Sequence, residues 1–382
     1  MLLPRTLTTV ITEKLHTSNK GIVLYGPRQS GKTTLINSII EDLKLRTLTI
    51  NGDQNRFIDI LSSRNAEKLK GLTAGYDLLF IDEAQRIPEI GINLKIILDS
   101  IKEVKVIATG SSSLDLASKI SEPLTGRVWT YRLYPISYME LSQIWNHAEL
   151  DTNIEDRLIY GSYPEVFTIA GYAQKKEYLQ NLTDAYLYKD LLELGDLRNS
   201  SKIRDLLKLI AFQVGSLVSL SELGSSLGMG KDTVDRYIDL LEKSFVIFRM
   251  RGFSRNLRKE IVKMGKIYFY DLGIRNMLID NLNLLKDRND VGQLWENFII
   301  VERMKYLSYS KQTASRYFWR THTGAELDYV EESGNQLQGF EFKYGIKTSK
   351  PPASWNLTYP ASSYSCINKD TYLPFLLGEN SS

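Results

Sequence analysis

The sequence predicts an α/β fold: a parallel sheet with helices on both faces, followed by a helical region and a C-terminal α/β region. Residues 21 to about 135 alternate short apolar runs with stretches of helical periodicity, the pattern of parallel strands joined by helices. After Tyr134 the pattern changes to long helical stretches with a few later strands. A chain of 382 residues is also too long for one small core, so we expect several domains.

The predicted elements place four domains along the chain. We expect an α/β domain over 1–135, a helical connecting region over 136–200, a helix-turn-helix region over 201–285 and a mixed α/β domain over 286–382. In the first domain the predicted strands are 22–25, 47–50, 77–81 and 104–109, with helices over 34–45 and 93–102 and mixed helical structure over 53–70. Farther along, helices are predicted over 175–194 and 294–306, and strands over 317–320, 327–331 and 338–343.

Composition narrows the class of protein. The single cysteine, Cys366, excludes an internal disulfide and favours a cytoplasmic setting. The start Met1-Leu-Leu-Pro-Arg5 lacks an apolar core, and no apolar run approaches the roughly 20 residues of a membrane helix, so neither a secretory signal nor a membrane contact is expected. The net charge of +3 does not predict a nucleic-acid partner, so any such role requires a local basic patch.

One loop carries a phosphate-binding motif. Gly26-Pro-Arg-Gln-Ser-Gly-Lys-Thr33 matches G-x-x-x-x-G-K-[ST], and it lies between an apolar strand and a helix, which a chance glycine-rich turn would rarely do. Inward-pointing backbone N–H groups and the helix N-terminus suit phosphates, Lys32 reaches the β- and γ-phosphates, and the Thr33 hydroxyl suits Mg²⁺. The sequence therefore predicts ATP and Mg²⁺ as ligands. The expected binding residues are Gly26, Pro27, Arg28, Gln29, Ser30, Gly31, Lys32, Thr33 and Thr34.

Two further strands end in polar side chains. Asp82 and Glu83 follow the apolar strand 77–81, at the edge of a parallel sheet where ligands bind. We expect Asp82 to hold Mg²⁺, mostly through water, and Glu83 to orient the attacking water; the alternative for Glu83 is an acid at a helix N-terminus. Thr109 and Ser111 end the next strand and are candidates for a contact to the γ-phosphate or the water, or simply for a serine-rich turn.

These motifs resemble the prokaryotic AAA-type P-loop ATPases of unknown function, which pair an ATPase domain with a characteristic C-terminal domain. The resemblance rests on Gly26–Thr34, Ile81–Gln85, Thr109–Ser113 and Leu124–Arg127, and on Gly161–Glu165, Tyr188–Asp190, Lys266–Asp271 and Trp295–Glu296. It implies that Arg127 acts as a sensor or finger arginine on the γ-phosphate, from its own or another subunit. The alternative for Arg127 is a surface salt bridge. Nothing in the sequence determines the oligomeric state.

A winged-helix region is predicted next. Ser219-Leu-Ser-Glu222 has the form of a capping box that opens a helix to Leu227, and a second amphipathic helix spans 232–242, with strands over 245–250 and 266–270 as the wing. The segment from Arg249 to Lys266 is locally basic and could contact DNA. Against DNA readout, the second helix exposes Asp232, Asp235, Asp239 and Glu242. The alternatives are a solvated basic loop or a surface that docks a protein partner.

A carboxylate pattern near the C-terminus resembles the PD-(D/E)xK nuclease core. Asp328 and Glu341 would form a second Mg²⁺ site, with Lys343 two residues farther on the same strand face and with Glu296 from a helix. Gly-Ala-Glu-Leu-Asp stands in place of the Pro-Asp element, which weakens the case for cleavage. The alternative is that the carboxylates pair with basic neighbours such as Arg320 and Lys343.

Three functions follow from these motifs. The preferred one is an ATP-hydrolysing switch in which Lys32 and Mg²⁺ offset phosphate charge, Glu83 places the water, and Arg127 and Ser111 assist, and whose nucleotide state repositions the C-terminal module. The second is an ATP-gated, Mg²⁺-dependent DNA nuclease. The third is a regulator that binds DNA or an unknown protein partner and uses ATP only as a ligand.

Overall fold

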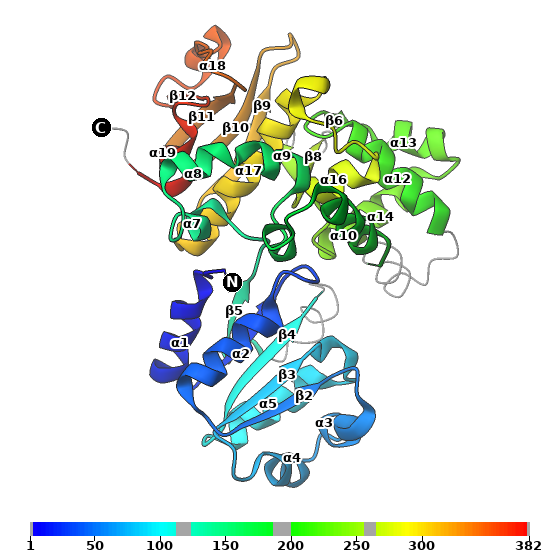
Figure 1. Cartoon of the computed structure of the whole chain (residues 1–382), viewed down its shortest axis with the longest axis vertical. Coiled ribbons are helices and arrows are strands. Elements are labelled where there is room, and N and C mark those ends of the chain that lie inside the picture. Colours follow the sequence, from blue (N-terminus) through cyan, green and yellow to red (C-terminus); the bar gives the residue numbers. More distant parts are fainter. Residues whose placement is uncertain (1–2, 112–123, 186–199, 256–264, 380–382) are drawn as a thin grey trace. The chain divides into compact units, whose positions relative to one another are not determined.

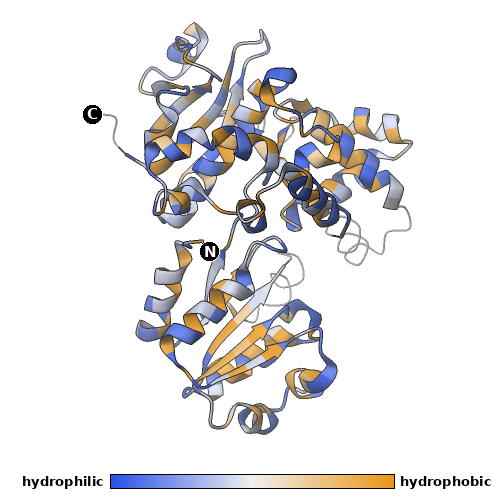
Figure 2. Ribbon diagram, viewed as in Figure 1, coloured by the Kyte–Doolittle hydropathy of each residue, from blue (hydrophilic) through white to orange (hydrophobic). Residues whose placement is uncertain are grey.

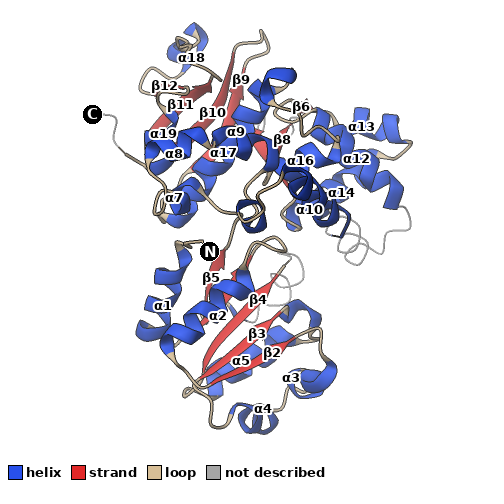
Figure 3. Cartoon of the chain, in the orientation of Figure 1, coloured by secondary structure: helices blue, strands red, loops and turns tan. Residues whose placement is uncertain are grey.

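The computed structural model describes residues 3–111, 124–185, 200–255 and 265–379. The chain forms two compact units, each built around its own sheet (Figure 1 and Figure 3). The N-terminal unit comprises Arg5–Pro135 with Lys243–Phe245, and the C-terminal unit comprises Met1–Pro4, Ile136–Glu242 and Val246–Ser382. Among the described residues, no helix combines the length and apolarity that crossing a membrane requires.

The N-terminal unit has a parallel five-stranded sheet in the order β2-β3-β4-β1-β5. Its strands are β1 (Gly21–Tyr25), β2 (Thr47–Asn51), β3 (Leu78–Asp82), β4 (Lys105–Gly110) and β5 (Val128–Arg132). Its helices are α1 (Leu7–Thr17), α2 (Lys32–Leu43), α3 (Ile58–Leu61), α4 (Ala66–Thr73) and α5 (Ile90–Ser100), with short 3-10 turns η1 (Asn55–Phe57) and η2 (Ala84–Arg86). The central strands are the most apolar part of the unit, as Figure 2 shows, because helices cover both faces.

Two elements of this unit were not predicted. Helix α1 buries Leu7, Ile11 and Leu15, which recur every four residues along one face. Strand β5 pairs with β1 at the edge of the sheet, and its side chains are mostly exposed or half-buried. An edge strand of this kind lacks the continuous apolar run by which buried parallel strands are recognised.

The C-terminal unit has a seven-stranded mixed sheet in the order β12-β11-β10-β9-β7-β8-β6. Its strands are β6 (Leu217–Val218), β7 (Ile247–Gly252), β8 (Gly265–Phe269), β9 (Ser315–Arg320), β10 (Glu326–Ser333), β11 (Gln336–Phe342) and β12 (Ser363–Ile367). Its α-helices are α7 (Tyr138–Leu141), α8 (His147–Thr152), α9 (Ile154–Tyr160), α10 (Tyr172–Ala185), α12 (Ser200–Phe212), α13 (Leu220–Leu227), α14 (Lys231–Lys243), α16 (Leu272–Leu278), α17 (Val291–Tyr309), α18 (Ala353–Thr358) and α19 (Tyr372–Leu377). Two 3-10 turns, η3 (Pro164–Phe167) and η5 (Leu285–Asp287), complete it.

The predicted helix-turn-helix and hairpin share this sheet with the C-terminal strands. Helices α13 and α14 are followed by β7 and β8, and β8 pairs antiparallel with both β7 and β6. Strand β7 also pairs in parallel with β9, where Arg251 lies opposite Tyr317. The strands on either side of residue 285, where sequence reasoning divided two domains, therefore belong to one sheet. Residues 186–194, the end of the predicted helix 175–194, lie outside the described part of the chain.

Candidate functional site

The chemistry-bearing residues of the N-terminal unit gather at one edge of its sheet. Strands β1, β3 and β4 run parallel, so their carboxyl ends lie at the same edge. The glycine-rich loop follows β1, Asp82 ends β3, and Ser111 follows β4. Asp82 ends β3 one position beyond the Ile81–Ala108 pair, and Thr109 of β4 pairs with Leu24 of β1.

The loop after β1 fits a phosphate group. A Cβ atom added to Gly26 would lie 2.1 Å from the carbonyl oxygen of Leu133, so only glycine allows this close approach. Lys32 opens α2, is 5% exposed, and donates from Nζ to the carbonyl oxygens of Gly26 (2.9 Å) and Pro27 (2.8 Å). The ammonium group thus lies against the loop, at a helix N-terminus whose first N–H groups have no partner within the helix.

An arginine that sequence reasoning missed holds this loop. Arg5 donates from Nη1 to the carbonyl oxygen of Ser30 (2.8 Å) and from Nη2 to that of Tyr134 (2.5 Å). One guanidinium therefore ties the loop to the segment that follows β5. Arg5 precedes the motif and matches no part of it, so nothing in the sequence could have pointed to this contact.

The carboxylate of Asp82 accepts hydrogen bonds from two threonine hydroxyl groups. Its Oδ2 accepts a hydrogen bond from Thr33 Oγ1 (2.8 Å), and its Oδ1 accepts one from Thr109 Oγ1. A carboxylate beside a hydroxyl is the hard oxygen donor set that Mg²⁺ prefers. The predicted pair of metal-binding residues, Thr33 and Asp82, is therefore brought together by the fold.

Glu83 and Ser111 are linked by a residue to which sequence reasoning gave no role. Gln85 Nε2 donates to Glu83 Oε2 (2.5 Å) and to Ser111 Oγ (3.2 Å). Gln85 belongs to the motif Ile81–Gln85, and its position two residues after Glu83 was the only sequence signal. Within the described part of the chain, the side-chain partners of Asp82 and Glu83 are hydroxyl and amide groups rather than cations.

Arg127 does not reach this edge, which corrects the expectation of a role at the loop of its own chain. It precedes β5 at the amino end of the strands, where its carbonyl oxygen accepts from the N–H of Gly21. Its Nε donates to Asp99 Oδ1 at 2.8 Å. This hydrogen bond raises the pKa of Arg127. The surface salt bridge that sequence reasoning left as the alternative is therefore present.

The C-terminal carboxylates surround a buried lysine. Lys266 of β8 is 3% exposed, and its Nζ lies 3.1 Å from Glu296 Oε1 and 2.6 Å from Glu326 Oε1. Tyr268 also donates to Glu296 (2.6 Å), and Arg320 pairs with Glu326 (3.2 Å). Burial alone would lower the pKa of Lys266, but the two glutamates reverse this effect and raise it.

Asp328 and Glu341, the predicted ligands of a second Mg²⁺, also have internal partners. Asp328 Oδ2 accepts from the N–H of Phe342 (2.8 Å), and Glu341 pairs with Lys343 (2.6 Å). Burial, with Glu296 and Glu341 nearby, raises the pKa of Asp328 to about 8. Among the described residues no group of three or more His, Cys, Asp or Glu side chains is arranged to hold a metal ion.

Much of the basic segment is also internally paired. Arg249 donates to Glu242 (2.7 Å) and to Asp235 (2.5 Å), and it lies 3.8 Å from Asp239. The acidic face of α14 therefore neutralises Arg249, as Glu296 and Glu326 neutralise Lys266. Of the other basic residues, Arg251 is exposed, and Arg255 is exposed but lies 3.8 Å from Glu332. Arg258, Lys259 and Lys263 lie outside the described residues.

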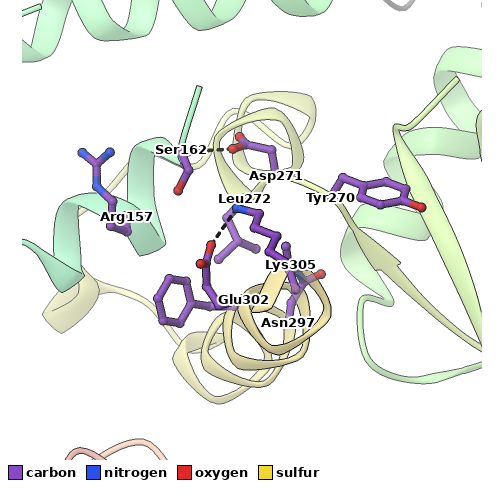
Figure 4. A pocket seen from close by; sticks show the side chains of 11 residues that line it. Arg157, Ser162, Tyr270, Asp271, Leu272, Asn297, Glu302 and Lys305 are labelled. Atoms are coloured by element: carbon purple, nitrogen blue, oxygen red, sulfur yellow. Dashed lines mark hydrogen bonds and ion pairs between the residues drawn. The ribbon is translucent and has the colours of Figure 1, made fainter. Parts of the chain in front are cut away.

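Two of the C-terminal motifs meet in a second buried polar cluster (Figure 4). Asp271 accepts from the N–H of Ser162 (2.7 Å), and a Cβ on Gly161 would lie 2.1 Å from Asp271 Oδ1. Beside them, Glu302 pairs with Lys305 at 2.6 Å. The adjacent cavity of about 10 Å³ has room for one water molecule. Packing contacts therefore explain the motifs Gly161–Glu165 and Lys266–Asp271. The motif Tyr188–Asp190 lies outside the described residues.

Comparison with known proteins matches three family models to successive parts of the chain. An AAA domain model matches residues 18–142, and two domains of unknown function match residues 151–285 (DUF8612) and 291–370 (DUF4143). An uncharacterized protein of Mycobacterium tuberculosis is 31% identical over 338 residues, which cover 87% of this chain and 71% of the relative. An uncharacterized protein of Methanocaldococcus jannaschii is 25% identical over 369 residues, covering 86% and 76%.

Among solved structures, a Walker-type ATPase of Pyrococcus abyssi matches with a TM-score of 0.48 and 16% identity, over 71% of this chain and 94% of the other. That similarity is too low to add to the assignment, which rests on the sequence matches and on the parallel sheet with its glycine-rich loop. The chain therefore belongs to the same protein family as the Mycobacterium tuberculosis relative, and it joins an AAA-type P-loop domain to a DUF4143 domain.

Proposed function

We propose that the N-terminal unit binds ATP with Mg²⁺ and hydrolyses it. The observation that carries this proposal is the meeting of Lys32, Thr33 and Asp82 at one sheet edge, with Thr33 Oγ1 2.8 Å from Asp82 Oδ2. A loop of backbone N–H groups, an ammonium group and a hard oxygen pair together match the three demands of a Mg²⁺–triphosphate ligand.

Each residue has a defined task in this proposal. Mg²⁺, when bound with ATP, supplies charge neutralisation on the phosphate oxygens. Lys32 leaves its loop carbonyls to contact the β- and γ-phosphates, and Thr33 and Asp82 hold the cation. Glu83 orients and polarises the attacking water, while Thr109 and Ser111 offer hydroxyl groups at the end of the neighbouring strand. No covalent intermediate is required, because positioning and charge stabilisation carry phosphoryl transfer.

Phosphate release from ATP by the full chain tests the proposal. Lys32→Ala should weaken ATP binding by at least about 10²-fold, because it removes the ammonium group that reaches the β- and γ-phosphates. Glu83→Gln should bind ATP normally and release phosphate at least about 10²-fold more slowly. Lys68→Ala and Glu67→Gln on the exposed side of α4 are matched controls. Normal turnover in both site variants would reject ATP hydrolysis here, and binding without any turnover in the wild type would leave ATP as a ligand only.

Coupling of ATP turnover to DNA is the finer part of the proposal. Arg251 and Arg255 remain exposed on the basic segment, so this is the part of the C-terminal unit that DNA would contact. We expect DNA to stimulate phosphate release, and Arg251→Ala with Arg255→Ala to reduce that stimulation without changing the rate in its absence. Equal rates with and without DNA would remove DNA from the function and leave a protein partner.

Nuclease activity is disfavoured by the internal pairing of the carboxylates. Glu296 and Glu326 share Lys266, and Glu341 pairs with Lys343. The ammonium groups of these lysines therefore neutralise the carboxylates that a second Mg²⁺ would need as ligands. Incubation of plasmid DNA with ATP, Mg²⁺ and either the wild type or Asp328→Ala decides the matter. Cleavage by the wild type alone would establish the nuclease; equal amounts of intact plasmid are the expected outcome.

A further inference from the structure

The side chain of Gln85 lies between two groups of the nucleotide site that come from different strands. Glu83 follows β3 in the left-handed region, with φ 50° and ψ 43°, and the chain then turns into η2. This turn brings Gln85 back beside Glu83, where Nε2 lies 2.5 Å from Glu83 Oε2 and 3.2 Å from Ser111 Oγ. A left-handed conformation is uncommon for a residue with a side chain, and it occurs often at functional sites.

The amide nitrogen of Gln85 has two hydrogens, and each has an acceptor here. One acceptor belongs to the end of β3 and the other follows β4. A carboxylate at the end of a strand can otherwise take several rotamers, whereas catalysis requires a fixed position within about 0.5 Å. Gln85 therefore sets the position of the Glu83 carboxylate relative to the Ser111 hydroxyl.

The other end of the same side chain argues against a merely structural role. Gln85 is 8% exposed, and its Oε1 is buried with no hydrogen-bond partner within the described residues. An unsatisfied buried acceptor destabilises the folded state, so a glutamine retained only for packing would be a poor choice. An apolar side chain of similar length would fill the same space without this cost.

We propose that Gln85 is a positioning residue for ATP hydrolysis: its amide group holds Glu83 and Ser111 in the arrangement that places the attacking water. The inference rests on the proposed function of this edge. It assigns to Gln85 an effect on turnover rather than on affinity, because its contacts are to Glu83 and Ser111 and not to the phosphate-binding loop. Gln85 acts through Glu83, so its effect should disappear where Glu83 itself is disabled.

The test compares Gln85→Met in two backgrounds. Methionine keeps the length and apolar body of the side chain but removes both hydrogen bonds. In the wild-type background kcat should fall by about 10- to 100-fold, while the Kd for a fluorescent ATP analogue changes less than about 3-fold. In the Glu83→Gln background the same substitution should change kcat by less than about 2-fold. Gln54→Met, at an exposed glutamine of the same unit, is the control.

Two outcomes would overturn the inference: an unchanged kcat in Gln85→Met, or equal reductions in both backgrounds. If Gln85→Met proves unstable, Ser111→Ala provides a second measurement. It removes only the other end of the contact, so it should lower kcat in the wild-type background and change it by less than about 2-fold in the Glu83→Gln background. A wild type that hydrolyses no ATP would remove the proposed function itself, whereas hydrolysis that depends on Glu83 and not on Gln85 would remove only this inference.

Discussion

Two clusters of carboxylates, Asp82 with Glu83 in the N-terminal unit and Glu296 with Glu326 in the C-terminal unit, differ in the source of the cation that balances their charge. At the sheet edge of the N-terminal unit, Asp82 and Glu83 are held by hydroxyl and amide groups, which orient a carboxylate without neutralising it. In the C-terminal unit, Glu296 and Glu326 are held by the ammonium group of Lys266, which is covalently part of the chain. The carboxylates of the N-terminal unit therefore keep a negative charge that a bound cation can neutralise. Those of the C-terminal unit are already neutralised by Lys266.

This difference separates two patterns that look alike in sequence. Asp82-Glu83 and the Asp328…Glu341 pair are both short acidic motifs at strand positions, and both predicted Mg²⁺. The basic side chains beside them distinguish the two motifs. Glu341 pairs with Lys343, two residues away, and the neighbouring Glu296 and Glu326 pair with Lys266 of β8, far away in sequence. The predictions below test the contrast, beginning with the largest expected effect.

Removing the ammonium group of Lys266 should destabilise the C-terminal unit around Glu296 and Glu326. Lys266→Met removes the cation that Glu296 and Glu326 share and leaves Arg320 beside Glu326 alone, which should lower the free energy of unfolding of the C-terminal unit by about 3–5 kcal/mol. Urea denaturation measures the loss, and Lys208→Met at an exposed position of α12 is the control. Adding Glu296→Gln should recover part of the stability. A stable Lys266→Met protein would mean that the lysine does not close this cluster.

Removing negative charge from the first cluster should act on turnover instead. Asp82→Asn keeps a side chain that Thr33 and Thr109 can hydrogen-bond but removes the charge that attracts Mg²⁺, so kcat should fall by about 10²-fold. The Mg²⁺ concentration for half-maximal rate should also rise. Phosphate release measured across a Mg²⁺ titration tests both, with Asp59→Asn at the exposed position of α3 as the control. An unchanged Mg²⁺ requirement would contradict the role of Asp82.

The pKa of Asp328 predicts how stability depends on pH. Because its folded pKa is raised to about 8, the folded state holds this proton between about pH 4 and 8 while the unfolded state has released it. The free energy of unfolding should therefore fall as pH rises through that window. Asp328→Asn cannot ionise, so it should remove this fall and exceed the wild type by about 1–3 kcal/mol at pH 8. Parallel pH profiles of the two proteins would contradict the raised pKa.

The smallest effect is expected from Arg127. Its salt bridge with Asp99 is exposed and lies away from the glycine-rich loop, so Arg127→Ala should change the ATPase rate by less than about 2-fold. Measuring the rate over a range of protein concentrations extends the test to contacts between chains. A loss of activity that appears only at high concentration would show that Arg127 serves the site of another copy.

The sequence alone predicted the N-terminal fold well because the information is local. An apolar run followed by Gly26–Thr33 specifies a strand, a loop and a helix within a few residues, and the fold indeed places them so. The strand ending in Asp82 was recognised for the same reason. Element bounds in this unit differ by at most three residues, as for α2, predicted over 34–45 and observed as Lys32–Leu43. Edge strand β5 was not predicted because its exposed and half-buried side chains form no continuous apolar run.

By itself, then, the sequence determined the α/β class, the phosphate-binding loop and the identity of the acids beside it, because each is encoded by neighbouring residues. Only the tertiary structure decided which charged and hydrogen-bonding side chains lie next to each other. Arg5 at the loop, Gln85 between Glu83 and Ser111, Arg127 on Asp99, and Lys266 between Glu296 and Glu326 are contacts of this kind. Electrostatic and hydrogen-bond partners are chosen by distance in space, and a pattern along the chain carries that distance only where the partners are close in sequence.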